Sequence, residues 1–123
     1  MSELPPPTRE VSRLVRIIGP EATLALVERW GGTRLYVPSP IPEGHEIWQV
    51  VGGDVARYLA ERYGHGQMMV PVARRWRVLV YRARGMSYAQ IARAVGGSER
   101  SVYRILSETE GAIAQLDMFD RPI

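Results

Sequence analysis

An internal repeat limits the folds that this chain of 123 residues can adopt. Residues 17–38 align with residues 50–71 without a gap, at an offset of 33 residues. Seven of the 22 aligned positions are identical, whereas average residue frequencies give roughly one or two by chance. A duplicated unit of this size cannot bury its apolar face alone, so each copy is expected to pack on a partner copy.

Each copy predicts a helix that ends at a glycine. Pro20 suits the first turn of the first helix, which is expected to run to about Trp30, and its counterpart is expected to run to about Tyr63. Gly31 and Gly64 follow these ends. Each is expected to adopt the left-handed conformation that terminates a helix.

A short extended run follows each glycine. These runs, 33–37 and 67–70, are both followed by a proline, which has no N–H to donate to a strand ladder. A strand this short is not stable alone, so each must pair with its repeat or with a second chain. Residues 38–46 between the copies are proline-rich and loop-like, and a further short helix is expected at 11–18.

Charge divides the chain into three parts. Residues 1–71 hold seven Arg and eight acids, residues 72–106 hold eight Arg and one acid, and residues 107–123 hold one Arg and four acids. The middle block therefore carries a net charge of +7 within 35 residues. Such a basic block is typical of a polyanion-binding site, most often one for nucleic acid.

The basic block also has the spacing of a helix-turn-helix. A helix is expected over 74–84, and Ser87 with Gln90 forms a capping box that begins a second helix. Gly96 supplies the turn, where a positive φ is required, and Ser98 caps the last helix. The inner faces of the two later helices are expected to carry Ile91, Ala92, Val95, Val102, Ile105 and Leu106.

The sequence therefore predicts a mainly α fold in three parts. Residues 1–71 form a dimerisation core from the duplicated helix–glycine turn–short strand unit, residues 72–108 form a helix-turn-helix DNA-binding domain, and residues 109–123 form an acidic C-terminal tail. The residues expected in the dimerisation core are Leu24, Leu26, Trp30, Tyr36, Leu59 and Tyr63.

The second helix of such a motif enters the major groove with its N-terminal part, so double-stranded DNA is the expected partner. A turn of about 100° per residue places Arg100 and Arg104 opposite the buried face. The residues expected at the groove are Ser98, Arg100, Ser101, Tyr103 and Arg104. The residues expected at phosphates are Arg74, Arg75, Arg77, Arg82, Arg84 and Arg93.

The order of these motifs resembles a known family. A helix followed by Gly-Gly-x-x-x-Tyr-Val-Pro at 31–38, a second copy at 64–71 and a helix-turn-helix at 88–106 resemble the Mor/C transcription activators of Mu-like phages and prophages. The resemblance implies a dimeric activator that binds DNA and recruits host RNA polymerase. It also implies that the second strand and its linker lie near DNA, through Gly66, Gln67 and Met69, although Met69 stands where the family has Tyr.

Two arrangements of the copies remain open. In one they pair within a single chain, so that the tandem copy mimics a homodimer core. In the other they pair across a homodimer. The homodimer is favoured because a single helix-turn-helix reads only a few base pairs, whereas a two-fold dimer doubles the site.

Other functions compete with activation. A repressor or a recombination accessory protein would bind DNA in the same way. An enzyme is disfavoured, because the chain has no Cys, only two His and no paired carboxylates, and for the same reason no metal or other cofactor is expected. No apolar run is long enough to cross a bilayer, and the N-terminus lacks the apolar core of a signal peptide, so a cytoplasmic location is expected. The resemblance implies that the cell is a bacterial host.

The tail contains the segment Gln-Leu-Asp-Met-Phe at 115–119, which resembles the bacterial sliding-clamp-binding motif. Gly111 is expected to end the last helix before this segment. The segment would then bind the sliding clamp, RNA polymerase or another partner, or it would fold back onto the helix-turn-helix. The residues expected to contact a partner are Gln115, Leu116, Met118 and Phe119.

Overall fold

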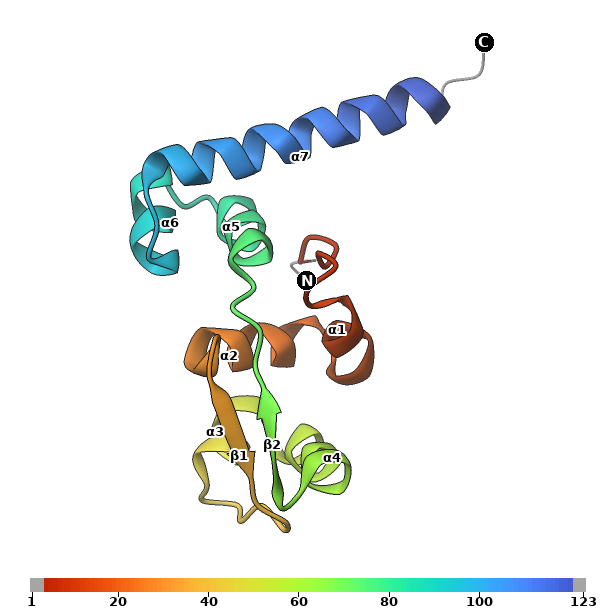
Figure 1. Ribbon diagram of the computed structural model, residues 1–123, viewed down its shortest axis with the longest axis vertical. Helices are drawn as coiled ribbons and strands as arrows, with labels where there is room; N and C mark the ends of the chain where they lie inside the picture. Colours follow the sequence, from red (N-terminus) through yellow and green to blue (C-terminus); the bar gives the residue numbers. More distant parts are fainter. Residues whose placement is uncertain (1–3, 121–123) are drawn as a thin grey trace. The chain divides into compact units, whose positions relative to one another are not determined.

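The computed structural model describes the backbone of residues 4–120 and the side chains of residues 4–111 (Figure 1). The fold is mainly helical with one two-stranded sheet, which confirms the predicted fold class. It divides into two compact units, the first ending at Ala73 and the second beginning at Arg74. The elements are α1 (Ser12–Ile18), α2 (Pro20–Trp30), β1 (Arg34–Val37), α3 (Glu46–Val51), α4 (Gly53–Tyr63), β2 (Gly66–Met69), α5 (Arg74–Ala83), α6 (Tyr88–Val95) and α7 (Glu99–Asp120).

The two copies fold in the same way, and each begins one helix earlier than the sequence repeat indicates. Helices α1 and α2 meet at Gly19, and α3 and α4 meet at Gly52. The backbone angles of these glycines nearly coincide, with φ 88° and ψ 160° at Gly19 and φ 86° and ψ 163° at Gly52. Helix α1 confirms the short helix expected at 11–18, whereas the sequence did not predict α3.

The strands of the two copies pair with each other within one chain. Strands β1 and β2 are antiparallel, and Leu35 lies opposite Met68, its equivalent in the repeat. A two-fold axis between these two residues therefore relates the copies. The flanking pairs that the same axis exchanges are Arg34–Met69 and Tyr36–Gln67.

Hydrogen bonds at both ends of this ribbon have the same symmetry. The Gly32 amide donates to the Val70 carbonyl, and the His65 amide donates to the Val37 carbonyl, both at 2.8 Å. Gly32 and His65 are equivalent positions of the repeat, as are Val37 and Val70. Each copy therefore closes one end of the ribbon against the other copy.

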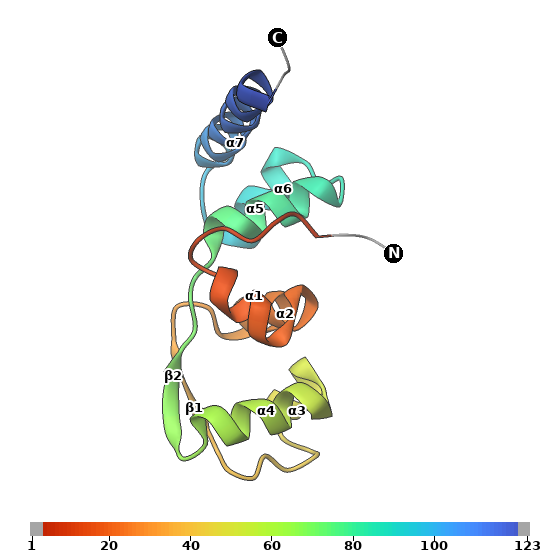
Figure 2. The ribbon, with the colours of Figure 1, turned by 90° about the vertical axis from the view of Figure 1, so that its right-hand side faces the viewer.

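One face of the ribbon is buried and the other is open. The four helices of the first unit lie on the same side of the ribbon (Figure 2). The buried side chains of the two strands and their ends are Leu35, Val37, Met68 and Val70. The opposite face exposes Arg34, Tyr36, Gln67 and Met69.

The left-handed residue after each helix lies one position later than predicted. Gly31 and Gly64 have φ of −53° and −55°, whereas Gly32 and His65 have φ of 83° and 66°. Glycine is required at positions 31 and 64 because there is no space for a Cβ. A Cβ would lie 2.4 Å from the carbonyl oxygen four residues earlier at Gly31, and 2.2 Å from it at Gly64.

The predicted core residues of this unit are buried to different degrees. Leu24, Leu26 and Leu59 are buried. Trp30 and Tyr63, at equivalent helix ends, are only partly buried. Tyr36 is 54% exposed on the open face of the ribbon. The apolar interior is thus built from the two copies of one chain, and the homodimer stays a prediction.

The end of the first unit is held by the N-terminal segment. Ala73 is fully buried and has a φ of 56°, a left-handed conformation that is unfavourable for a residue with a Cβ. The Ala73 amide donates to Oε1 of Glu10 at 3.1 Å. Glu10 lies 63 residues away in the sequence, so no local pattern predicts this contact.

Candidate nucleic-acid interface

The second unit contains three helices whose ends are set by local sequence. The Ser87 hydroxyl accepts from the Gln90 amide at 3.1 Å, and the Gln90 side chain accepts from the Ser87 amide at 2.9 Å, which is the predicted capping box of α6. Gly96 ends α6 with the predicted positive φ of 69°. The Ser98 hydroxyl accepts from the Ser101 amide at 3.1 Å, as expected of a cap at the start of α7.

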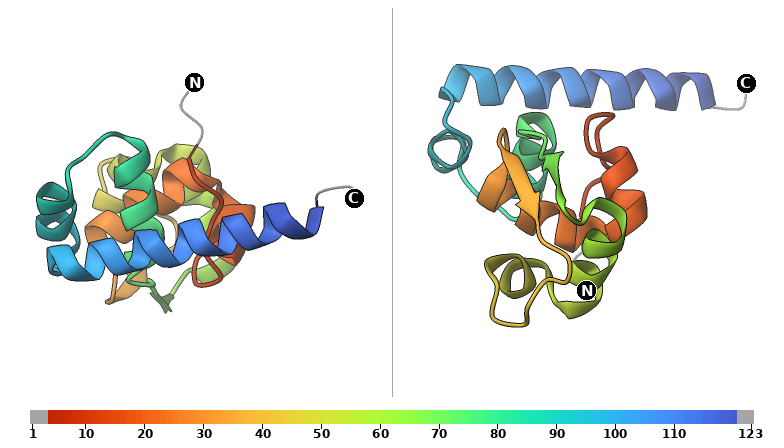
Figure 3. Two further views of the ribbon diagram at one scale, coloured as in Figure 1. Left: turned by 90° about the horizontal axis from the view of Figure 1, so that it is seen from above. Right: turned by 60° about the horizontal axis from the view of Figure 1, so that its bottom comes forward.

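The apolar faces of the three helices form one core. The first half of α7 crosses α5 and α6, and its second half extends beyond them (Figure 3). The buried residues of α6 and α7 are the predicted ones, Ile91, Ala92, Val95, Val102, Ile105 and Leu106. Helix α5 adds Trp76, Val78, Val80 and Tyr81. This core fixes which face of α7 remains open.

The open face of α7 carries the predicted groove residues. Arg100, Tyr103 and Arg104 are exposed, Tyr103 to 61%. Ser98 is exposed and Ser101 is partly buried. The Ser98 oxygen accepts the cap hydrogen bond, so its hydroxyl proton can still be donated to an external acceptor such as a phosphate. We call Ser98, Arg100, Ser101, Tyr103 and Arg104 the groove face.

Tyr88 connects α5 to the groove face, a role that the sequence pattern does not indicate. The Arg82 guanidinium lies 4.9 Å from the centre of the Tyr88 ring. The Tyr88 ring centre lies 6.3 Å from that of Tyr103. Arg82 also donates to the Met86 carbonyl at 3.0 Å. The Tyr88 ring therefore interacts both with Arg82 of α5 and with Tyr103 of the groove face.

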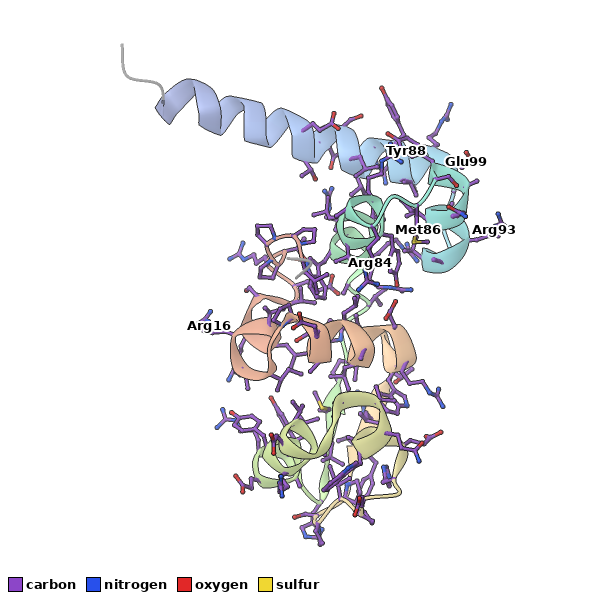
Figure 4. The ribbon with its side chains drawn as sticks, turned by 180° about the vertical axis from the view of Figure 1, so that it is seen from behind. Arg16, Arg84, Met86, Tyr88, Arg93 and Glu99 are labelled. Carbon is purple, nitrogen blue, oxygen red and sulfur yellow. The ribbon has the colours of Figure 1, made fainter. Side chains whose placement is uncertain are left out.

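Five of the six arginines predicted at phosphates are exposed. They are Arg74, Arg75, Arg82, Arg84 and Arg93. Arg93 points away from the three helices (Figure 4). Exposed arginines on α5, on the turn after it and on α6 would place positive charge along the phosphates that flank a bound groove.

Arg75 and Arg77 have partners within the unit. Arg75 forms an ion pair with Glu108 of α7. Arg77 donates to the Ala94 carbonyl at 2.9 Å, and its guanidinium lies 5.6 Å from the centre of the Tyr81 ring. Arg77 therefore holds α5 against α6, and the Glu108 carboxylate competes with a phosphate for Arg75.

Glu108 is an acid within the basic unit that the sequence pattern does not assign to the site. The hydrogen bond from Arg75 lowers the pKa of Glu108; desolvation raises it, and the charges of Arg75 and Arg104 lower it further. Glu108 lies one helical turn after Arg104, so a helical wheel can reveal that proximity. Arg75 lies 33 residues earlier, and no sequence spacing reveals its contact.

The strand residues that the resemblance places near DNA belong to the first unit. Gln67 and Met69 are exposed on the open face of the ribbon, and Gly66 is partly buried. Gln67 and Met69 are therefore accessible on β2, as a contact with a macromolecule requires.

The predicted end of the last helix at Gly111 is wrong, because α7 continues through Gly111 to Asp120. A single glycine weakens a helix by about 1 kcal/mol relative to alanine, but it does not have to end one. The side chains of Gln115, Leu116, Met118 and Phe119 lie outside the described residues. Their contact with a partner stays a prediction.

Two other kinds of feature are absent from the described part of the chain. Among the described residues, no group of three or more His, Asp or Glu side chains is placed to hold a metal ion. None of the described helices is long and apolar enough to cross a membrane.

Comparison with known proteins bears on the second unit. Residues 69–117 match the profile of a homeodomain-like domain of the helix-turn-helix type. No curated protein and no solved structure shows a significant match to the chain. The profile match, the three-helix core and the arginines around α7 identify the second unit as a DNA-binding helix-turn-helix domain.

Proposed function

We propose that this protein regulates transcription from a specific DNA sequence, as an activator of the phage or prophage type. The groove face carries the proposal: Arg100, Tyr103 and Arg104 are exposed on a helix whose other side is fixed in the core. In helix-turn-helix proteins the N-terminal part of this helix lies in the major groove. Arginines at that place read guanine edges through bidentate hydrogen bonds.

Phosphate contacts complete the interface. The exposed Arg74, Arg82, Arg84 and Arg93 hold the domain in register on the duplex, while the groove face selects the bases. Each neutralised phosphate releases counterions, so the affinity falls steeply as the salt concentration rises. No cofactor takes part in this function, and it is carried out in the cytoplasm of a bacterial host.

The activating step rests on the resemblance of 31–38 and 64–71 to the Mor/C activators, which implies recruitment of host RNA polymerase. A repressor and a recombination accessory protein would use the same DNA interface. They differ from an activator in the events after binding, so binding and transcription are measured separately.

Sequencing of the DNA fragments retained by the purified protein tests sequence-specific binding. We expect one enriched motif that the Arg100→Ala/Arg104→Ala double variant does not enrich. Transcription in vitro by bacterial RNA polymerase, from a template with that motif, then tests activation. We expect more transcript with the wild type than with the double variant.

Each outcome has a defined meaning. Retention of DNA with no enriched motif contradicts sequence-specific binding. An enriched motif with less transcript indicates a repressor. An enriched motif with unchanged transcript indicates an accessory role outside transcription.

A further inference from the structure

We infer that one chain carries the whole of its dimerisation core and reads DNA with a single helix-turn-helix, so that its target is one asymmetric half-site. The DNA part of this inference rests on the proposed function. The expected DNA target is thus a single half-site and not the two-fold site that a homodimer would need. Three observations support it: the two-fold axis within the chain, the matched burial of the two copies, and the different segments after the two strands.

A homodimer of two chains, each with one copy of the repeat, would have the same two-fold axis. Leu35 and Met68 are equivalent residues and lie opposite each other in the ribbon. A strand that meets its own equivalent in an antiparallel pair has the arrangement of an isologous interface, in which the same patch contacts itself. Here both halves of that interface belong to one chain.

Equivalent residues of the two copies are buried together. Leu26 and Leu59 are both fully buried, as are Val37 and Val70. These positions form the apolar face that a single copy would have to cover with a second chain. Because the tandem copy covers it, the first unit does not need another chain to complete its core.

The axis relates the two copies, but the segments that come after the two strands differ. Val70 and Pro71 lead through Ala73 into α5 and the DNA-binding unit. The equivalent Val37 and Pro38 lead into a loop and then α3. A two-fold dimer presents two recognition helices about 34 Å apart, one helical turn of DNA. One chain presents a single such helix, so its site has no second half.

The pairing within one chain can be tested by a disulfide, because the wild-type chain has no Cys. The Val70 amide donates to the Thr33 carbonyl at 2.9 Å, which makes the Tyr36–Gln67 pair a non-hydrogen-bonded one with Cα atoms close together. We expect the oxidised Tyr36→Cys/Gln67→Cys variant to run as a single chain without free thiols. Both residues are exposed, so the core is left intact.

The single variant Tyr36→Cys is the matched control, since it can form a disulfide only between chains. If the oxidised double variant runs mostly as a covalent dimer at low micromolar concentration, β1 of one chain pairs with β2 of another. That result overturns the inference whether or not the protein binds DNA.

Sedimentation and DNA footprinting complete the test. We expect the full chain at micromolar concentration to sediment with the mass of one chain, 13.8 kDa. On DNA we expect one chain per site, a motif without two-fold symmetry, and protection within about one helical turn. A palindromic motif with two chains bound overturns the inference and leaves the proposed function standing. Failure to bind any DNA contradicts the proposed function, while the mass and the disulfide still decide the state of the core.

Discussion

At Gly31 and Gly64 the chain leaves a helix so close to the last turn of that helix that no Cβ fits. Each glycine has an ordinary negative φ, so conformational freedom is not what the position requires. At each position the nearest atom in the way is a backbone carbonyl oxygen, which cannot turn aside as a side chain can. The two positions therefore tolerate no side chain for a steric reason.

We expect Gly64→Ala to lower the free energy of unfolding by about 1–3 kcal/mol, the usual range for overpacking. The new Cβ would lie 2.2 Å from the Ala60 oxygen and 2.5 Å from Ser39 Cβ. Gly44→Ala is the control, because nothing lies within 4 Å of its Cβ position, and it should change stability by less than about 0.5 kcal/mol. Urea denaturation measures both, and equal effects would contradict the steric argument.

Base contacts and phosphate contacts can be separated at single arginines. We expect Arg100→Ala and Arg104→Ala to weaken binding to the enriched motif more than Arg9→Ala, an exposed arginine of the first unit. A lost phosphate contact also reduces the slope of log K against log salt by about 0.9. A variant with lower affinity and an unchanged slope has lost a base contact. Wild-type affinity in the Arg100→Ala/Arg104→Ala variant would exclude the groove face as the reader.

Glu108 of α7 competes with DNA phosphates for Arg75. Arg75 and Arg104 lower the pKa of Glu108, mainly through the Arg75 hydrogen bond. A carboxyl group whose pKa is lowered by folding adds stability above its ordinary pKa. That contribution is lost as the pH falls through the lowered value. Near neutral pH Glu108 is ionised and paired with Arg75, so it competes with a phosphate for that guanidinium.

We therefore expect Glu108→Gln to bind DNA more tightly at low salt, by a few-fold, with a salt slope steeper by up to about 0.9. Glu110→Gln removes the same charge from an exposed position without releasing Arg75, and serves as the control. Fluorescence anisotropy over a series of salt concentrations measures both. If the two variants change the slope equally, Arg75 does not reach a phosphate.

The elements predicted from the sequence are those with local determinants. The Ser87–Gln90 capping box and the turn at Gly96 depend on residues within a few positions, and both are confirmed. Helix α3 has six residues and comes directly after a proline-rich loop, so its periodicity is too short to recognise. The sequence does not show that Gly31 and Gly64 lie too close to the preceding helical turn for a Cβ, so it does not reveal that the next residue takes the positive φ.

Contacts over long sequence separations explain what could not be predicted at the site. Five of the six phosphate arginines have the exposure that the charge pattern led us to expect. The ion pair that engages Arg75 joins residues 33 positions apart, and the bond that holds Ala73 joins residues 63 positions apart. Such contacts arise from the packing of helices, and a single sequence carries no trace of them.

At the scale of the whole molecule, two units with separate cores are joined at Ala73 and Arg74. We expect each core to unfold independently, while the other core stays folded. Leu59→Ala removes a fully buried side chain from the first unit, and Ile91→Ala removes one from the second. Each should cost about 2–5 kcal/mol within its own unit.

Native-state hydrogen exchange by mass spectrometry measures this. Leu59→Ala should accelerate exchange in α2, α4 and the ribbon while α6 keeps its protection, and Ile91→Ala should do the reverse. Acceleration of every helix to the same extent in either variant would show that the chain unfolds as one cooperative body.

The ribbon at Leu35 and Met68 also affects how the protein responds to its own abundance. Two halves joined in one chain meet at an effective concentration on the order of millimolar, whatever the number of molecules in the cell. A core shared by two chains dissociates when copies are scarce, and site occupancy then rises with the square of the copy number. When each chain contains its complete core, the occupancy of a rarely filled site rises in direct proportion to the copy number. A cell with half as many molecules keeps half the occupancy and not a quarter of it.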